Sequence, residues 1–161
     1  MTKAGAALVQ PDGLSALVLK GLLAGAVGVT AMTLAEKVEQ AVTKRPNSYV
    51  PAHTLQRLFG REKQDRLATN WAMHWGQGIV LGPLRALMAY RNIRGPFGSL
   101  LFLNLRLLND QTLENATGAG SPPWTWPVSE QLVDILHKGI YAFATGAVVD
   151  RVVCPKVPNG G

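Results

Sequence analysis

Two histidines and one aspartate are the side chains of this 161-residue sequence that are best suited to acid–base chemistry. They are His74 in the middle of the chain, and Asp134 and His137 near its C-terminal end. A histidine, or a carboxylate with a shifted pKa, can take up and release protons beside a bound molecule. We therefore take His74, Asp134 and His137 as the candidate catalytic residues.

Polar side chains at helical spacing accompany these three residues. Asn70 and Gln77 flank His74 at distances of four and three residues, so the three share one face of a helix. Two further polar series, in residues 106–114 and 130–141, repeat this spacing, and Glu36 and Gln40 form a shorter one. From these series we expect four side chains to contact a ligand: Asn70, Gln77, Glu114 and Tyr141.

Ordinary structural roles compete with chemistry for many of these polar residues. Asp134 and Lys138 stand four residues apart, as do Arg106 and Asp110, and such pairs form simple salt bridges on helix surfaces. Glu36 lies at the polar end of an apolar segment, where a carboxylate is well solvated. Spacing alone does not separate these two roles.

A metal site is the other chemistry that the spacing allows. Asp134 and His137 have the carboxylate–x–x–histidine pattern of di-metal sites in helical bundles, but His74 has no carboxylate beside it to complete a second motif. A single ion held by His74, His137 and a carboxylate is the remaining alternative. One cysteine, Cys154, excludes a multi-thiolate zinc site and an internal disulfide. Our expectation is no metal and no cofactor.

Long apolar segments must position these side chains. Residues 14–35 are mostly apolar and carry one charge, Lys20. They would form roughly 33 Å of helix, enough to cross the hydrocarbon core of a bilayer. Residues 67–90 form a second candidate span, whose first 18 residues carry no formal charge. The apolar run at 96–108 is too short to cross alone, and the last segment is continuously apolar only at 139–149.

The fold predicted from these segments is all-α, because no strand-like alternation persists anywhere in the sequence. We expect a four-helix up-down bundle, integral to the membrane, with a short third helix. A short additional helix is expected at 54–59, in the connector between the first two spans. The predicted organisation is a flexible leader at 1–13, a single helical membrane domain at 14–153 and a flexible tail at 154–161, with helices at about 14–43, 67–91, 96–115 and 128–153.

Glycines recur at four-residue spacing on the first two helices. Gly21, Gly25 and Gly28 share a face of the first, and Gly78 and Gly82 share a face of the second. Small residues on one face let helices approach closely in a membrane. The partners expected are therefore the lipid bilayer, a lipophilic small molecule and, through the glycine-rich faces, another copy of the chain.

The net charge of +6 invites a nucleic-acid interpretation, which the distribution of charge opposes. Nucleic-acid binding needs a basic stripe on a solvated domain, whereas here the basic residues flank apolar helices. Only 16% of residues are charged, below the roughly 25% that is usual for soluble proteins. In an up-down bundle, nearly all acids and all four tryptophans gather at one end. We expect no nucleic-acid partner.

Two alternatives to an integral membrane protein remain open. A secretory signal is one, because Val29-Thr30-Ala31 resembles a cleavage site, although Lys20 interrupts the apolar region before it. A soluble all-α protein whose helices bury one another is the other. The predicted location is a membrane, crossed more than once.

The Gly/Ala-rich first helix, together with the segment NWAMHWGQG at 70–78, resembles small multi-pass membrane proteins of the YagU-like kind. The resemblance implies a membrane location and no particular activity.

The function expected from the sequence is that of a small multi-pass membrane protein which binds or organises a lipophilic small molecule or partner, without catalysis. This expectation rests on the apolar spans, the clustered tryptophans and the lack of a complete catalytic or metal motif. The alternative is a membrane-embedded acid–base enzyme, of the isomerase or cyclase type, acting on a hydrophobic small molecule. It would use His74 with Asp134 or His137.

Overall fold

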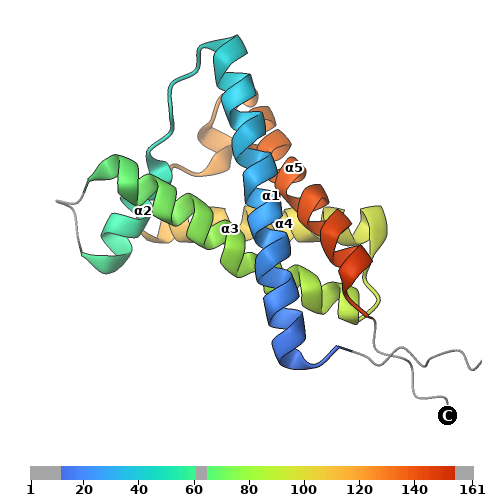
Figure 1. Cartoon of the computed structure of the whole chain (residues 1–161). Coiled ribbons are helices and arrows are strands. Elements are labelled where there is room, and N and C mark those ends of the chain that lie inside the picture. The colour runs from blue at the N-terminus through green and yellow to red at the C-terminus, as the bar shows by residue number, and fades with distance from the viewer. Residues whose placement is uncertain (1–11, 61–64, 155–161) are drawn as a thin grey trace, which may run out of the picture.

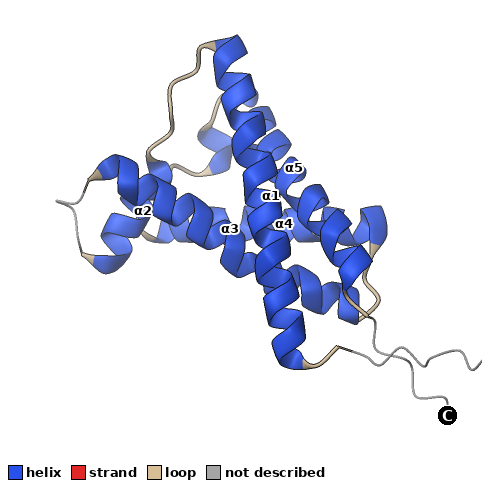
Figure 2. Ribbon diagram, in the orientation of Figure 1, coloured by secondary structure: helices blue, strands red, loops and turns tan. Residues whose placement is uncertain are grey.

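A computed structural model describes residues 12–60 and 65–154 of the chain. In these ranges the regular structure consists of five α-helices and one short 3-10 turn, and no strand is present (Figures 1 and 2). The predicted all-α class is confirmed. Most of the predicted leader at 1–13 and of the predicted tail at 154–161 lies outside the described residues.

The helices are α1 at Leu14–Thr43, α2 at Val50–Phe59, α3 at Arg66–Tyr90, α4 at Gly95–Ala116 and α5 at Val128–Val152. The 3-10 turn, η1, lies at Pro123–Thr125. Helix α2 begins earlier than expected, because Pro51 occupies its first turn. Proline has no backbone N–H, and in the first turn of a helix this group would have no partner within the helix. Helix α4 has 22 residues, so it is not short: its polar second half continues the helix beyond the apolar run.

The long helices cross one another rather than lying parallel as in an aligned up-down bundle. Figure 1 shows α1 and α5 side by side, with α3 and α4 running across them. The reason lies in the contact between α1 and α3, where glycines let the two backbones touch. A Cβ atom on Gly25 would lie 2.7 Å from the carbonyl oxygen of Gly78 and 2.8 Å from that of Ile79. Any larger side chain would keep the helices apart.

The glycine face of α1 is thus occupied within one chain. Gly21 meets the backbone of Pro83, and Gly28 meets the side chains of Tyr141 and Thr145. A second copy of the chain would have to pack against other surfaces.

The apolar core has two parts. The first is centred on Val29, Phe102 and Tyr141, which are fully buried. The second is smaller and contains Leu17 and Val149. Beside the second part, the buried guanidinium of Arg85 binds both carboxylate oxygens of Asp150 at 2.9 Å. Arg94 donates to the backbone carbonyls of Asp150 and Val153 at 2.9 and 2.7 Å, which fixes the end of α5.

The first and last described segments meet at this same end of the molecule. The Asp12 carboxylate accepts a hydrogen bond from the backbone amide of Cys154 at 2.7 Å, and pairs with Lys20 at 2.6 Å. The Lys20 ammonium therefore has a fixed counter-charge beside the N-terminal end of α1.

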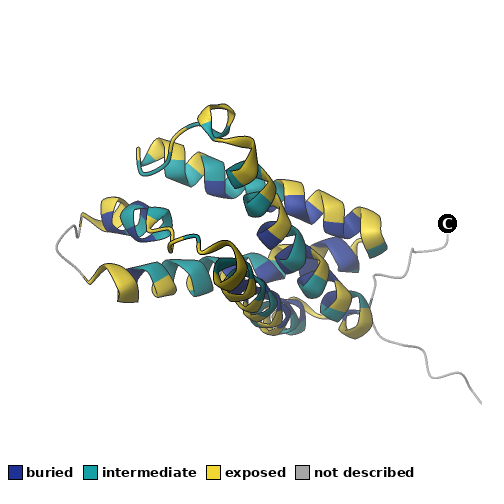
Figure 3. Ribbon diagram, turned by 90° about the horizontal axis from the view of Figure 1, so that it is seen from above, coloured by how far each residue is buried: buried dark blue, intermediate teal, exposed yellow. Residues whose placement is uncertain are grey.

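Two of the described helices, α1 and α5, are long and apolar enough to cross a membrane. A core helix of a soluble protein, or a signal sequence near the N-terminus, can meet the same criterion. Helix α3, expected as the second span, does not meet it, because Asn70, His74 and Gln77 lower its hydropathy. Figure 3 shows exposed residues along the outer faces of the helices. They include the large apolar side chains of Leu23 and Leu34.

Candidate functional site

A cavity of about 380 Å³ lies between the C-terminal half of α1, the connector with α2, and parts of α3, α4 and α5. Its wall contains apolar side chains such as Met32 and Val133, together with many charged ones. The charged side chains are Glu36, Lys37, Arg45, Arg106, Asp110, Glu114, Glu130, Asp134 and Lys138.

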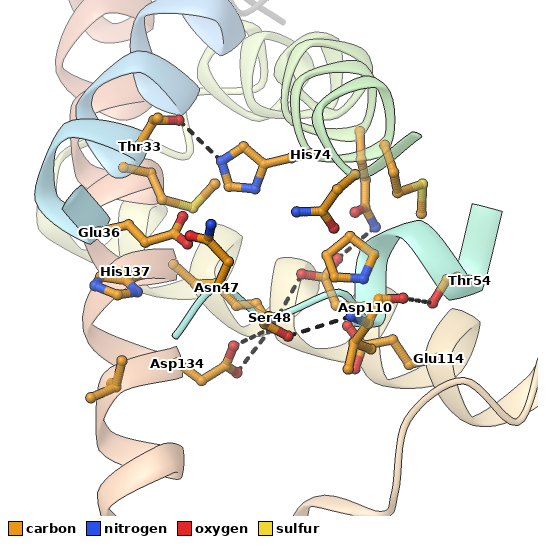
Figure 4. A pocket seen from close by; sticks show the side chains of 18 of the residues that line it. Thr33, Glu36, Asn47, Ser48, Thr54, His74, Asp110, Glu114, Asp134 and His137 are labelled. Carbon is orange, nitrogen blue, oxygen red and sulfur yellow. Dashed lines mark hydrogen bonds and ion pairs between the residues drawn. The ribbon is translucent and has the colours of Figure 1, made fainter. Parts of the chain in front are cut away.

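The structure brings six of the seven predicted site residues to this wall (Figure 4). The exception is Tyr141, which is fully buried beneath it. Its hydroxyl donates to the carbonyl oxygen of Gly78 at 2.6 Å, and its ring packs against Phe102. Tyr141 therefore joins α5 to α3 and does not line the cavity. The six residues at the wall are Asn70, His74, Gln77, Glu114, Asp134 and His137.

Asp110 joins the polar faces of three helices at the bottom of the cavity. Its carboxylate accepts hydrogen bonds from Arg106 Nε at 3.0 Å and Gln77 Nε2 at 2.6 Å, and pairs with Lys138 Nζ at 3.2 Å. Lys138 also pairs with Asp134 at 2.8 Å. Arg106, Asp110 and Lys138 are all buried, so their salt bridges are not the surface pairs that the i,i+4 spacing allowed. Two cations and two carboxylates form a neutral network.

His74 does not contact Asp134, which the sequence analysis named as a possible acid–base partner. Instead, its Nε2 lies 3.0 Å from the hydroxyl oxygen of Thr33. That hydroxyl donates its hydrogen to the carbonyl oxygen of Val29 at 2.7 Å, so its oxygen accepts from Nε2–H. The neutral His74 ring then has its proton on Nε2 and an acceptor at Nδ1.

His137 is buried at the wall, and its Nε2 has no hydrogen-bond partner among the described residues. The nearest carboxylate oxygen, on Glu39, is 4.0 Å away. The charge of a second carboxylate, Glu36, acts on the rings of both His137 and His74. Figure 4 shows Glu36 on the same side of the cavity as the two rings. Glu36, rather than Asp134, is thus the carboxylate that the two histidines share.

The rim of the cavity is held by the connector between α1 and α3. Arg45 pairs with Glu39 of α1 at 3.1 Å and with Glu130 of α5 at 3.3 Å. The side-chain oxygen of Asn70 accepts from the backbone amide of Ala52 at 3.1 Å, which fixes α2 against α3. Asn70 therefore positions the wall as well as lining it.

Glu114 lies near the C-terminal end of α4 and has no ion-pair partner among the described residues. Burial raises the pKa of its carboxyl to about 7. The Lys138 ammonium acts against this rise, and the carboxylates of Asp110 and Asp134 add to it. Near neutral pH this carboxyl is poised between its charged and neutral forms.

A metal site receives no support from this arrangement. Among residues 12–60 and 65–154, no three His, Cys, Asp or Glu side chains are grouped so as to hold a metal ion. The alternative of a single ion on His74, His137 and a carboxylate thus has no ligand set in the described part of the chain.

Several wall residues could not be found by sequence reasoning. Arg45, Asn47 and Ser48 lie in an irregular connector with no periodic pattern, and Trp126 follows the 3-10 turn. The polar series around Arg106 and Asp110 was visible, but its spacing does not reveal that these side chains are buried. The pairing of Arg45 with Glu130 joins residues 85 positions apart.

Comparison with known proteins identifies no relative: no family model, no curated protein and no solved structure matches this chain.

Proposed function

We propose that this chain is a small helical membrane protein whose cavity binds a small amphiphilic molecule, without catalysing its conversion. The observation that carries the proposal is the cavity of about 380 Å³, whose wall combines ionisable and apolar side chains from four helices and the connector. Ligand cavities in proteins typically measure about 300–1,000 Å³, and a few polar groups in an otherwise apolar lining orient the ligand.

A membrane location is supported by how little of the apolar helices is covered. Only 44% of the most apolar window of α1, and 33% of that of α5, is buried inside the protein. A core helix of a soluble protein would be mostly buried. Exposed apolar surface on this scale needs lipid or another partner to cover it.

Binding without catalysis is favoured by the partners of the expected acid–base groups. Asp134 is engaged by Lys138, and the Nε2 of His74 is engaged by Thr33. An acid–base enzyme is the second candidate, because both imidazoles and Glu36 line the same cavity. In that case Glu36, and not Asp134 as predicted from the sequence, would be the carboxylate that acts with the histidines in acid–base chemistry.

The experiment has a membrane arm and a binding arm. We expect the chain to stay in the membrane pellet after carbonate extraction; release into the supernatant would refute the membrane part.

For the binding arm, the thermal unfolding of two detergent-purified variants is measured in the presence of butylammonium, butyrate or 1-butanol. Val133→Trp fills the cavity, whereas Leu132→Trp places the same indole side chain at an exposed neighbour. At least one compound should raise the Tm of the Leu132 variant but not that of the Val133 variant. Equal responses of the two variants to all three would refute cavity binding.

The same experiment separates the two candidates. Any compound recovered after incubation should be chemically unchanged if the protein only binds it. Conversion that is lost in His74→Gln would favour the enzyme.

A further inference from the structure

We infer that the ligand of this cavity is an organic cation, with Glu36 and Glu114 as its counter-charges. The inference deepens the proposed function and rests on it. Some charges at the wall already have partners within the protein, and others do not.

The buried basic side chains at the wall all have carboxylate partners. Lys138 pairs with Asp110 and Asp134, and Arg106 pairs with Asp110 at 3.0 Å. Arg45, at the rim, pairs with Glu39 and Glu130. An anionic ligand would have to compete with these existing partners.

Two acidic side chains at the wall, in contrast, have no cationic partner in the described part of the chain. Glu36 accepts one hydrogen bond, from Gln40 Nε2 at 3.0 Å, and forms no ion pair. Glu114 forms none either. In total the wall holds five carboxylates and four basic side chains, and the fourth basic side chain, Lys37, is exposed and bound to the amide oxygens of Gln40 and Asn47 at 2.9 Å. The charge that remains unpaired inside the cavity is therefore negative.

A second, independent feature is the imidazole of His137 at the same wall. The residue is only 8% exposed, and its Nε2 has no hydrogen-bond partner among the described residues. Buried polar atoms without a partner are uncommon and costly in folded proteins. In the neutral ring this nitrogen can accept a hydrogen bond from an ammonium group that also binds the nearby Glu36. A ligand cation would thus satisfy both groups.

Aromatic side chains complete the environment that organic cations prefer. Trp71 and Trp126 both line the cavity. The face of an indole ring attracts ammonium groups, and its apolar surface can cover the alkyl part of the ligand.

One buried donor could be read in favour of an anion. Arg106 Nη1 has no hydrogen-bond partner among the described residues. Its guanidinium carbon, however, lies 5.1 Å from the centre of the Tyr141 ring, so this cation is stabilised by the ring and by Asp110. Tyr141 lies beneath the wall, and Arg106 is turned toward it.

The test measures binding of three probes of equal length to the full chain in detergent at pH 8: butylammonium, butyrate and 1-butanol. We expect butylammonium to bind with the lowest Kd of the three by calorimetry. Because a charge-assisted hydrogen bond contributes about 1.5–3 kcal/mol, Glu36→Gln should raise this Kd at least about tenfold. Glu114→Gln should raise it as well. The matched control, Asp12→Asn, removes the same charge at the opposite end of the molecule and should leave the Kd unchanged.

The outcomes separate this inference from the proposed function. If butyrate or 1-butanol binds more tightly than butylammonium, and Val133→Trp abolishes that binding, the cavity binds ligands but the cation inference is wrong. If butylammonium binds equally well to the native chain, Glu36→Gln and Glu114→Gln, the inference is also wrong. If none of the probes binds, both proposals fail. The comparison of probes on the native chain needs no variant, so misfolding of Glu36→Gln does not obstruct the test.

Discussion

The close approach of α1 and α3 can be tested with two glycine-to-alanine substitutions of opposite expected effect. At Gly25, a Cβ atom would lie within 2.8 Å of two backbone carbonyl oxygens of α3. A backbone atom cannot rotate away as a side chain can, so the helices must separate. At Gly76, on α3 itself, nothing lies within 4 Å of the added atom. Gly76→Ala is therefore the matched control.

The expected magnitudes follow from two effects. Alanine is more favourable than glycine inside a helix by about 1 kcal/mol, and both variants gain this. Overfilling a packed contact costs about 1–3 kcal/mol, and the upper half of that range applies to Gly25→Ala because its neighbours are rigid. Gly25→Ala should thus be destabilised by about 1–2 kcal/mol, while Gly76→Ala should be stabilised by up to about 1 kcal/mol.

Thermal unfolding in detergent, followed by circular dichroism, would measure the difference. For a chain of this size, 1 kcal/mol corresponds to about 2–4 °C in Tm. The two variants should therefore differ by about 4–12 °C, with Gly25→Ala lower. Equal Tm values, or a higher value for Gly25→Ala, would show that α1 and α3 do not touch at these glycines, and our account of the crossed helices would fail.

Three further substitutions test the site. The Glu114 carboxyl has a pKa of about 7 in the folded chain against an ordinary value of 4.5, so the folded state holds more protons between these pH values and its stability should fall as pH rises through them. Glu114→Gln removes this loss. Its free energy of unfolding should match that of the native chain at pH 4 and exceed it at pH 8 by about 1–2 kcal/mol, after allowance for partial exposure. Parallel profiles of Tm against pH for the two proteins would contradict this. Lys138→Met leaves the carboxylates of Asp110 and Asp134 without their shared cation and should destabilise the fold by about 3 kcal/mol in the same assay; an unchanged Tm would mean that the buried network is not formed. Tyr141→Phe should cost only about 1 kcal/mol, the value of the hydrogen bond to the Gly78 carbonyl, and should leave butylammonium binding unchanged in calorimetry. A large loss of binding would place Tyr141 at the cavity after all.

The helices could be predicted because their signals are local. The sequence shows the apolar run that begins at Leu14. It also shows Pro96, which lies in the first turn of α4, and Pro127, which directly precedes α5. The predicted bounds of α4, 96–115, agree with the structure to within one residue at each end, although the helix is not short. The absence of formal charge in residues 67–84 overstated α3 as a membrane span, because its uncharged polar residues Asn70, His74 and Gln77 lower its hydropathy.

The polar faces and the i,i+4 pairs within α4 and α5 could likewise be predicted, but the partners on other helices could not. The series Asn70–Gln77 fixes which side of α3 is polar, and that side does line the cavity. The pair of Asp134 and Lys138 follows from their four-residue spacing within α5, but whether Asp134 also meets His74 depends on how α5 is rotated against α3, which the periodicity of either helix leaves undetermined. The close approach of α1 and α3 at Gly25 is likewise a contact between backbones far apart in the chain, which the periodicity of either helix does not reveal.

The hydrogen bond between Asp12 and the amide of Cys154 has a consequence for membrane topology. It holds the start of α1 and the end of α5 at one point of the molecule. In a bilayer, two ends held together must lie on the same side, so the chain between them crosses an even number of times. A reporter of sidedness fused to either terminus should give the same answer, whichever compartment that is.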